Sequence, residues 1–205
     1  YTKYSNTIKV AREVIGLQPG FNTFATMHIL NSKKGTYFVA DTLINRHPSK
    51  EIMKDIARLA EKSVRFFNHT PITAMVSYSN FGTDKNGSAE AVHRAIEELQ
   101  REYPEWAIDG EMQVNVAMDK ELRDTKYPFT RLKGLDVNTL VFPNLTSANA
   151  SYKFVQAMSP DTEVIGPIQM GLNKAIHFID FERKMRDIVN VTAVAVIDAM
   201  VNKDR

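Results

Sequence analysis

The sequence predicts an α/β fold in which an open, mainly parallel sheet is flanked by helices. First, short β-rich runs alternate with longer amphipathic stretches from about residue 72 onward, an order typical of strands joined by helical crossovers. Second, hydrophobic residues make up 43% and charged residues 24% of the 205 residues, which is the composition of a globular protein with a real core. Third, residues 185–200 predict a helix that is apolar nearly all round and therefore has to be buried on most sides.

The first fifty residues predict a helix followed by a β-hairpin. Apolar side chains recur at helical spacing over residues 8–15, and Gly16 then provides a stop signal. Two β-rich runs, residues 23–30 and 36–41, flank a turn sequence at residues 31–35.

Regular alternation of helix and strand follows. Pro48 and Ser49 open a long amphipathic helix. A buried strand is predicted over residues 72–78, and the helix over residues 88–102 has Ser88 as its expected N-cap. The remaining elements are a strand over residues 139–142, a helix over residues 147–158, a strand over residues 163–168 that Gly166 and Pro167 stop, and the last helix.

Composition excludes several classes of function. The net charge is only +2 and no basic stripe is interleaved with aromatic residues, so no nucleic-acid partner is expected. Cysteine is absent, and the five histidines never occur at His-x-x-x-His spacing, so no metal site is expected. No apolar run of eighteen residues and no N-terminal signal pattern is found, which predicts no membrane partner and a cytoplasmic location.

Two common catalytic or nucleotide-binding patterns are also missing. The nine glycines never form Gly-x-Gly-x-x-Gly, and the segment from Gly166 to Gly171 lacks the Lys-Ser/Thr pair of a P-loop. Ser77 and Ser79 follow a predicted strand, but no Gly-x-Ser-x-Gly elbow surrounds them. Neither a nicotinamide nucleotide site nor a serine triad is therefore expected in this chain.

Residues 77–83 are the first candidate site, because ligands of open α/β sheets bind at the carboxyl ends of strands. The hydroxyl groups of Ser77 and Ser79, the amide groups near Asn80 and the backbone at Gly82 would suit a phosphate group. An ordinary polar turn that leaves a core strand is the alternative.

Two carboxylates and an amide, Asp109, Glu111 and Gln113, surround Gly110 and form a second candidate site. A tight turn that caps the next helix explains Asp109 and Gly110 equally well. The cations best placed for an anionic ligand follow in the sequence at Arg131 and Lys133, although a solvated basic turn is the simpler interpretation.

Asn144 and Asn149 follow another buried strand in the same way as residues 77–83. Asn144 could cap the next helix or face a ligand, and the residues alone do not decide between the two roles. Gly166 and Gly171 most simply end a strand and turn the backbone.

The motifs from residue 109 to residue 201, taken in order, resemble the phosphate acetyltransferase family. Within it, the chain is most similar to the phosphotransacetylase-like C-terminal domain of bacterial NADP-dependent malic enzymes. Residues 79–82 favour this branch, because they read Ser-Asn-Phe-Gly where transferases tend to have Ser-Thr-Lys-Gly. The motifs that carry the resemblance are Asp-Gly-Glu-Met-Gln (109–113), Arg-Leu-Lys-Gly (131–134), Val-Phe-Pro-Asn-Leu (141–145), Ala-Asn-Ala-Ser-Tyr-Lys (148–153), Gly-Pro-Ile-Gln-Met-Gly-Leu-Asn-Lys (166–174) and Asp-Ile-Val-Asn (187–190).

The resemblance implies a phosphotransacetylase or isocitrate-dehydrogenase-like fold of two lobes. Residues 1–165 would form the second, inserted lobe, and residues 166–205 would return to the first lobe, whose N-terminal part would precede Tyr1. A chain that opens without methionine, directly in a helical pattern, fits such a piece of a longer polypeptide. The apolar last helix would then be covered by a second copy, which predicts a homo-oligomer, most simply a dimer.

The resemblance also implies a ligand and a function. The expected ligand is a coenzyme A thioester or an acyl phosphate, and acetyl-CoA would act as an effector of a malic enzyme whose NADP and divalent metal are bound outside this chain. An active phosphate acetyltransferase, which moves an acetyl group between phosphate and coenzyme A, is the rival interpretation. The residues expected to line the ligand site are Ser77, Ser79, Asn80, Gly82, Asp109, Glu111, Gln113, Arg131, Lys133, Asn144, Asn149, Gly166 and Gly171.

One departure from the family pattern argues against transferase activity. Active members carry Ser-Arg-Gly shortly before the last helix, and the arginine stabilises negative charge on the transferred group. Asp180 and Phe181 occupy the serine and arginine positions here, followed by Glu182. Asp187 keeps the family's catalytic aspartate position, but a place in the first turn of a helix explains that residue as well.

Overall fold

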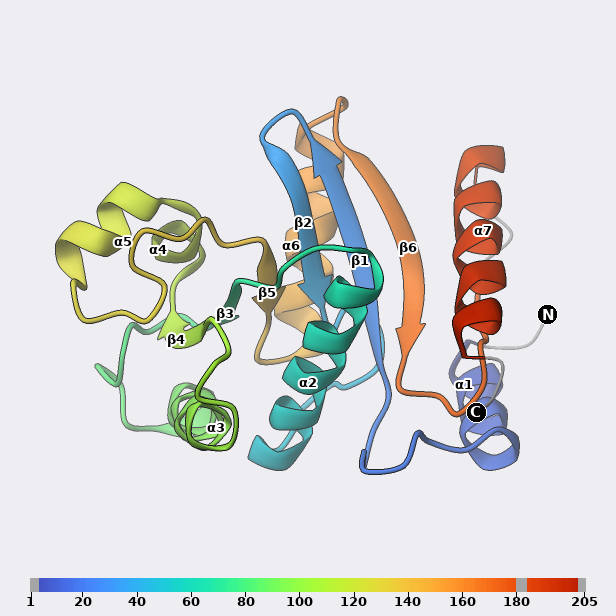
Figure 1. The fold of residues 1–205 in the computed structure, drawn as a ribbon, viewed down its shortest axis with the longest axis horizontal. Coiled ribbons are helices and arrows are strands. Elements are labelled where there is room, and N and C mark those ends of the chain that lie inside the picture. Colours follow the sequence, from blue (N-terminus) through green and yellow to red (C-terminus); the bar gives the residue numbers. More distant parts are fainter. Residues whose placement is uncertain (1–3, 180–183, 203–205) are drawn as a thin grey trace.

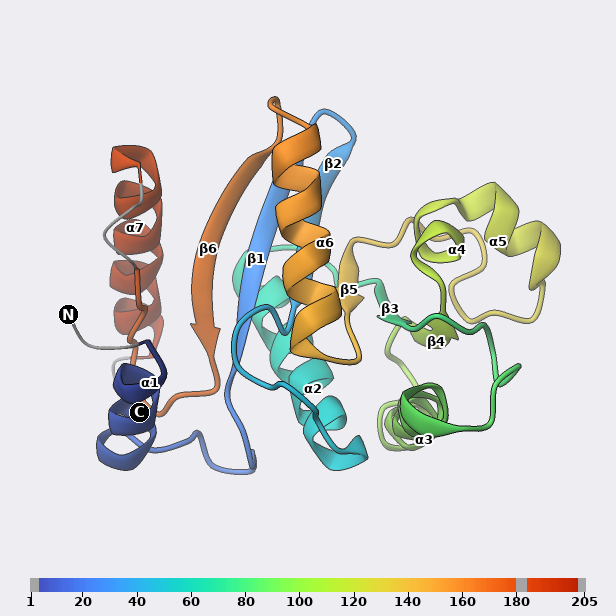
Figure 2. The same cartoon turned by 180° about the vertical axis from the view of Figure 1, so that it is seen from behind.

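A computed structural model describes residues 4–179 and 184–202 of the chain, and it contains one six-stranded sheet with helices on both faces (Figures 1 and 2). The strands are β1 (Ala25–Ser32), β2 (Gly35–Ala40), β3 (Thr73–Val76), β4 (Ile108–Met112), β5 (Thr139–Val141) and β6 (Glu163–Met170). The helices are α1 (Tyr4–Val14), α2 (Lys50–Phe66), α3 (Gly87–Glu102), α4 (Val114–Met118), α5 (Lys120–Lys126), α6 (Leu145–Met158) and α7 (Met185–Val201).

The sheet is mixed, with the order β4-β3-β5-β2-β1-β6. Its three pairings from β4 to β2 are parallel, whereas β1 pairs antiparallel with both β2 and β6. The predicted open, mainly parallel sheet with flanking helices is therefore confirmed, and the predicted hairpin supplies one of the two antiparallel pairings.

Each face of the sheet carries its own apolar layer, because successive side chains of a strand point to opposite faces. On β1, Met27 and Ile29 belong to the core that packs under α2 and α3, whereas Leu30 belongs to the core under α4 and α6. The two views in Figures 1 and 2 show α2 in front of the sheet on one side and α6 on the other.

Side-chain caps position two of these helices. Ser49 caps α2 by accepting a hydrogen bond from the Ile52 backbone amide, as the Pro48-Ser49 start predicts. Asn144 caps α6 in the same way by accepting from the Ser147 amide. The expected cap of α3 is wrong: α3 begins at Gly87 with Asn86 as N-cap and no side-chain cap bond, so Ser88 already lies inside the helix.

Two further expectations are corrected. The segment around Asp109 is not a turn but the buried edge strand β4, and glycine is needed there because a Cβ at Gly110 would collide with the Met75 carbonyl oxygen on β3. Gly166 and Pro167 do not stop their strand, since β6 continues to Met170. A Cβ at Gly166 would lie 2.8 Å from the His28 ring, so glycine allows β1 and β6 to pair.

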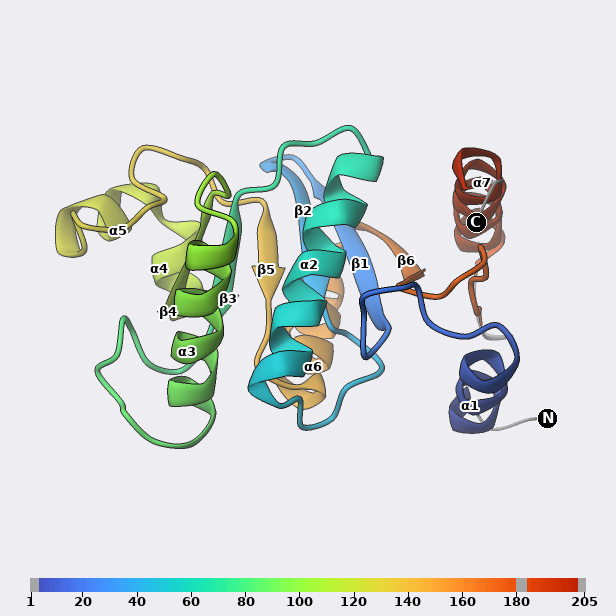
Figure 3. The ribbon, with the colours of Figure 1, turned by 60° about the horizontal axis from the view of Figure 1, so that its bottom comes forward.

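Helices α1 and α7 both lie beyond β6, at one end of the sheet (Figure 3). Only Val191 and Val194 of α7 are buried in the chain, while Ile188, Val189 and several later apolar side chains are exposed. The expectation that this helix is buried on most sides is therefore wrong for the single chain. The predicted lobe boundary at residue 165 falls inside β6, and the division into two lobes stays a prediction.

Candidate functional site

The topology brings four of the expected site residues, together with Asp41, to the carboxyl ends of the strands. Strands β2 to β6 run in the same direction, so their carboxyl ends meet at the edge where ligands of α/β proteins bind. The residues at or just beyond these ends are Gln113 after β4, Ser77 after β3, Asn144 after β5, Asp41 after β2 and Gly171 after β6. Ser79, Asn80 and Gly82 lie in the loop that follows Ser77.

A fully buried carboxylate, Glu111, organises this loop. Its Oε1 atom accepts hydrogen bonds from the Ser79 hydroxyl at 2.9 Å and from the Gly82 backbone amide at 2.7 Å. Its Oε2 atom lies 2.9 Å from Nδ1 of His93 on α3. Glu111 therefore joins the β3–α3 loop to the helix, a role that the sequence alone did not reveal for His93.

The side chains of Asn80 and Gln113 also hold the loop of residues 77–83 in place. Asn80 Oδ1 accepts from the Gln113 backbone amide at 2.9 Å, and Gln113 Nε2 donates to the Tyr78 carbonyl oxygen at 2.8 Å. Ser77 differs, because its hydroxyl is buried and has no hydrogen-bond partner within the described part of the chain. Most polar groups of the loop thus hold its shape, whereas the Ser77 hydroxyl is buried without a partner among the described residues.

Asp109 anchors the segment that contains Arg131 and Lys133, and it does not face a ligand. Its Oδ2 atom accepts from the Thr130 hydroxyl at 2.7 Å and from the Arg131 backbone amide at 2.8 Å, while Oδ1 accepts from Gln100 on α3. The side chains of Arg131 and Lys133 are exposed and make no hydrogen bond or ion pair with other described residues. Both cations remain open to an anion.

Asn149 and a residue that the sequence reasoning missed, Asp41, order the neighbouring loop. Asp41 is 2% exposed and accepts hydrogen bonds from the backbone amides of Thr26 and Asn45, at 2.9 and 2.7 Å. Burial raises the pKa of this carboxyl group above its ordinary value, although these hydrogen bonds act in the opposite direction. Asn149 Nδ2 donates to the Thr42 carbonyl oxygen at 3.2 Å, which ties α6 to this loop.

Asp187 lies near the amino end of β6, whereas Ser77 and Asn144 follow the carboxyl ends of their strands. It is in the first turn of α7, beside Arg186 and Asn190, and both of these neighbours contact Glu163 at the start of β6. Strand β6 runs away from that end toward Gly171. Asp180 and Phe181 lie outside the described residues.

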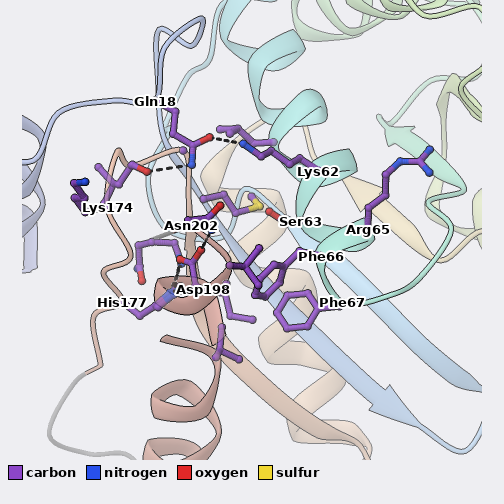
Figure 4. Close-up of a pocket in the computed structure, with 18 residues that line it drawn as sticks. Gln18, Lys62, Ser63, Arg65, Phe66, Phe67, Lys174, His177, Asp198 and Asn202 are labelled. Atoms are coloured by element: carbon purple, nitrogen blue, oxygen red, sulfur yellow. Dashed lines mark hydrogen bonds and ion pairs between the residues drawn. The ribbon is translucent and has the colours of Figure 1, made fainter. Parts of the chain in front are cut away.

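Two cavities each contain one of the expected site residues, and a third, larger groove contains none of them. Gly82 lines a cavity of about 360 Å³ with His93, Asp84 and Lys85. Gly171 lines another of about 330 Å³ between β6, α2 and α7 (Figure 4). A larger apolar groove of about 510 Å³ lies between the sheet, α4 and α6, and Tyr37 and Phe142 line it.

Over residues 4–179 and 184–202, no group of three or more His, Asp or Glu side chains is placed to hold a metal ion. Within the same residues, no helix is long and apolar enough to cross a membrane.

Comparison with known proteins identifies the family. The model of the phosphate acetyl/butaryl transferase family matches residues 1–196. The chain is 34% identical over 196 residues to the NADP-dependent malic enzyme of Salmonella typhimurium and 36% identical over 168 residues to the phosphate acetyltransferase of Clostridium acetobutylicum. These alignments cover 96% and 82% of this chain, but only 26% and 50% of the two relatives.

Solved structures agree with these relatives. A phosphotransacetylase from Streptococcus pyogenes superposes with a TM-score of 0.88 at 28% sequence identity, covering all of this chain and 61% of that one. EutD phosphotransacetylase from Staphylococcus aureus gives a TM-score of 0.85 at 27% identity, covering 98% of this chain and 61% of that one. A match along nearly the whole chain, together with this shared fold, places the protein in the phosphate acetyl/butaryl transferase family.

Proposed function

We propose that this chain is the regulatory and assembly unit of an NADP-dependent malic enzyme, which as a whole converts malate to pyruvate. The observation that carries the proposal is the sequence at residues 180 and 181. Asp180 and Phe181 replace the serine and arginine of active transferases, so the cation that would stabilise a transferred group is missing. The similarity to malic enzymes over 96% of the chain supports the same proposal.

The NADP and the divalent metal of such an enzyme do not fit the residues of this chain. Its glycines form no dinucleotide-binding pattern, and the described residues contain no metal-holding cluster of three acidic or histidine side chains. Both groups would therefore be bound elsewhere in the whole enzyme, and no catalytic step is assigned to this chain.

An active phosphate acetyltransferase is the second candidate function. It is favoured by the 36% identity to the Clostridium acetobutylicum enzyme and by the superposition on solved phosphotransacetylases. A coupled assay for acetyl phosphate formation separates the two candidates, because only the transferase would convert acetyl-CoA and phosphate to acetyl phosphate and coenzyme A.

The regulatory proposal predicts that acetyl-CoA binds to the full natural protein. We place the effector at the carboxyl ends of the strands, against Ser77, Ser79, Asn80, Asn144 and Gly171. Asp109 is left out of this site, because both of its carboxylate oxygens are engaged by other residues of the chain. Calorimetric titration should give a measurable affinity that falls as salt rises, because coenzyme A carries several phosphate charges. Replacing Asn80 by Ala should weaken binding by about tenfold, since the loop loses the bond to the Gln113 amide that shapes it.

The matched control is Asn6→Ala, because Asn6 is exposed on α1 and its side chain makes no hydrogen bond with the described residues. Thermal unfolding of both variants separates a loss of affinity from a loss of folding. If alanine variants of Ser79, Asn80 and Asn144 bind acetyl-CoA with the same affinity as the wild-type protein, this placement of the effector is wrong.

The proposal also predicts self-association through α7. Exposed apolar side chains gather on this helix, among them Val189, Val196, Ile197 and Met200, with exposed fractions of 51–71%. A patch of this kind is unusual on a monomer, so we expect a homo-oligomer, most simply a dimer. Light scattering at micromolar concentration should give at least twice the mass of one chain. Replacing Val196 by Asp should lower that mass, while Val114→Asp on α4, equally an exposed apolar side chain, should leave it unchanged.

A further inference from the structure

Three aromatic rings form a cluster beside β4. The ring of Phe81, in the loop of residues 77–83, lies 4.8 Å from the ring of Tyr127 and 5.1 Å from that of Phe129, measured between ring centroids. Phe129 is 67% exposed, so its ring is open to a ligand. The two other rings support it from the side of the protein, and the cluster offers an aromatic surface on which a flat ligand can stack.

The backbone holds these rings in place before any ligand binds. Phe81 has a left-handed backbone conformation (φ 48°), which is unfavourable for a bulky residue, and its amide donates to the Glu111 carbonyl oxygen at 2.7 Å. On the other segment, Asp109 accepts a hydrogen bond from the Arg131 backbone amide at 2.8 Å, two residues after Phe129. A surface that is fixed in this way loses little conformational freedom when a ligand binds.

Two cations, Arg131 and Lys133, closely follow the exposed ring in the chain. They come two and four residues after Phe129, so their Cα atoms lie within about 7 and 14 Å of the Phe129 Cα atom. Both side chains are exposed, and neither makes a hydrogen bond or ion pair with the residues that the structure describes. Both charges are therefore available to an anion bound near the ring.

The charge balance of the same segment also favours an anion. Residues 120–136 contain five basic and three acidic residues. Two of the three acidic residues are engaged: Asp124 accepts a hydrogen bond from the Gly134 amide at 2.7 Å, and Asp136 pairs with Lys120 at 2.9 Å. The carboxylates thus neutralise only part of the basic charge around Phe129.

We propose that this surface binds a purine nucleotide, with its base stacked on Phe129 and its phosphate groups at Arg131 and Lys133. A nucleotide joins a flat ring to an anion through one sugar, which matches an exposed ring followed within four residues by two cations. The inference comes from ring exposure and charge, so it does not rest on the proposed function. A free nucleotide such as ADP and the nucleotide end of coenzyme A share this chemistry, and both are sources of the ligand.

Photolabelling of the full natural protein with 8-azido-ADP tests the location. The label should mark the tryptic peptide of residues 127–131, which contains Tyr127 and Phe129. ADP should protect this peptide at concentrations at least about tenfold lower than adenosine or ribose 5-phosphate, because each of these lacks one half of the recognition. The labelled peptide identifies the site, so an NADP site elsewhere in the whole enzyme does not interfere.

Adenosine 3′,5′-bisphosphate, which is the nucleotide end of coenzyme A, distinguishes the two sources of the ligand. It should protect the peptide better than ADP if the surface receives coenzyme A, and less well if the surface receives a free nucleotide. Either order supports the nucleotide site.

Phe129→Ala should raise the ADP concentration needed for half-maximal protection by about tenfold, because the base loses its stacking partner. Phe154→Ala is the matched control, since Phe154 is 66% exposed on α6. Lys133→Gln should weaken protection by ADP and reduce its dependence on salt, whereas Lys153→Gln on α6 should leave both unchanged. Thermal unfolding shows whether all four variants fold.

The absence of label from residues 127–131 would overturn the proposal, as would equal effects of Phe129→Ala and Phe154→Ala in variants that fold. Tighter binding of a single-stranded oligonucleotide than of ADP would also overturn it, because the surface would then be a nucleic-acid site.

Discussion

Acetyl phosphate formation by the full natural protein should be about two to three orders of magnitude slower than that of an authentic phosphate acetyltransferase. A cation directed at charge that develops in the transition state stabilises that state by about 3 to 4 kcal/mol. The family resemblance implies that Phe181 stands where active members carry this cation. Asp180 adds a negative charge next to that position, which opposes the binding of phosphate. The measurement is the rate of acetyl phosphate formation from acetyl-CoA and phosphate, with the full-length protein so that no part of the family's active site is missing.

The double change Asp180→Ser with Phe181→Arg restores the family pattern and provides the matching test. A gain in the rate of acetyl phosphate formation would place residues 180–182 at the reacting groups. Arg183→Ala is the control, since that neighbouring cation does not hold the family's arginine position. Turnover by the unaltered protein at the rate of an authentic transferase would overturn the regulatory proposal and establish its rival.

In the structure, Asp187 lies at the start of α7. It occupies the first turn of α7, where Lys184 is the N-cap and no side chain caps the free amide groups. A carboxylate in this turn stabilises the helix through the dipole of the backbone. Asp187 also lies near the amino ends of the strands, while Ser77 lies at a carboxyl end. The expected site residues therefore do not form a single cluster within this chain.

The fold could be predicted well because its elements have strong local signals. The periodic apolar face of α2 and its Ser49 cap, or the β1–β2 hairpin, follow from spacing and turn residues alone. Edge strand β4 was missed because Asp109, Gly110 and Glu111 have low strand propensity. They form a strand only because both carboxylates find buried hydrogen-bond donors on other elements, and no local pattern reports such partners.

The candidate site was predicted less completely for the same reason. A polar loop after a strand pointed to residues 77–83, and the parallel pairing of β3, β4 and β5 brings that loop to Gln113 and Asn144. His93, whose ring nitrogen contacts the Glu111 carboxylate, lies on α3. Its position therefore depends on how α3 packs. The cavity at the carboxyl end of β6 joins side chains of α2, β6 and α7 that are far apart in the chain, which one sequence cannot reveal.

Glu111→Ala should produce the largest loss of stability among substitutions of the candidate site residues, about 3 kcal/mol or more in the free energy of unfolding. The native carboxylate is fully buried and receives hydrogen bonds from Ser79, Gly82 and His93 in one place. Alanine removes the acceptor that the Ser79 hydroxyl, the Gly82 amide and His93 share, and it also opens a cavity where the side chain was.

Urea unfolding measures this loss, and Glu90→Ala is the matched control because Glu90 makes only a surface ion pair with Arg94 on the same helix. The control should change the free energy of unfolding by less than about 1 kcal/mol. A Glu111→Ala protein as stable as the Glu90→Ala protein would show that the loop of residues 77–83 holds its shape without the buried carboxylate. If the loss is as large as expected, the effector affinity of this variant should fall as well, because the loop that we place against acetyl-CoA takes its form from Glu111.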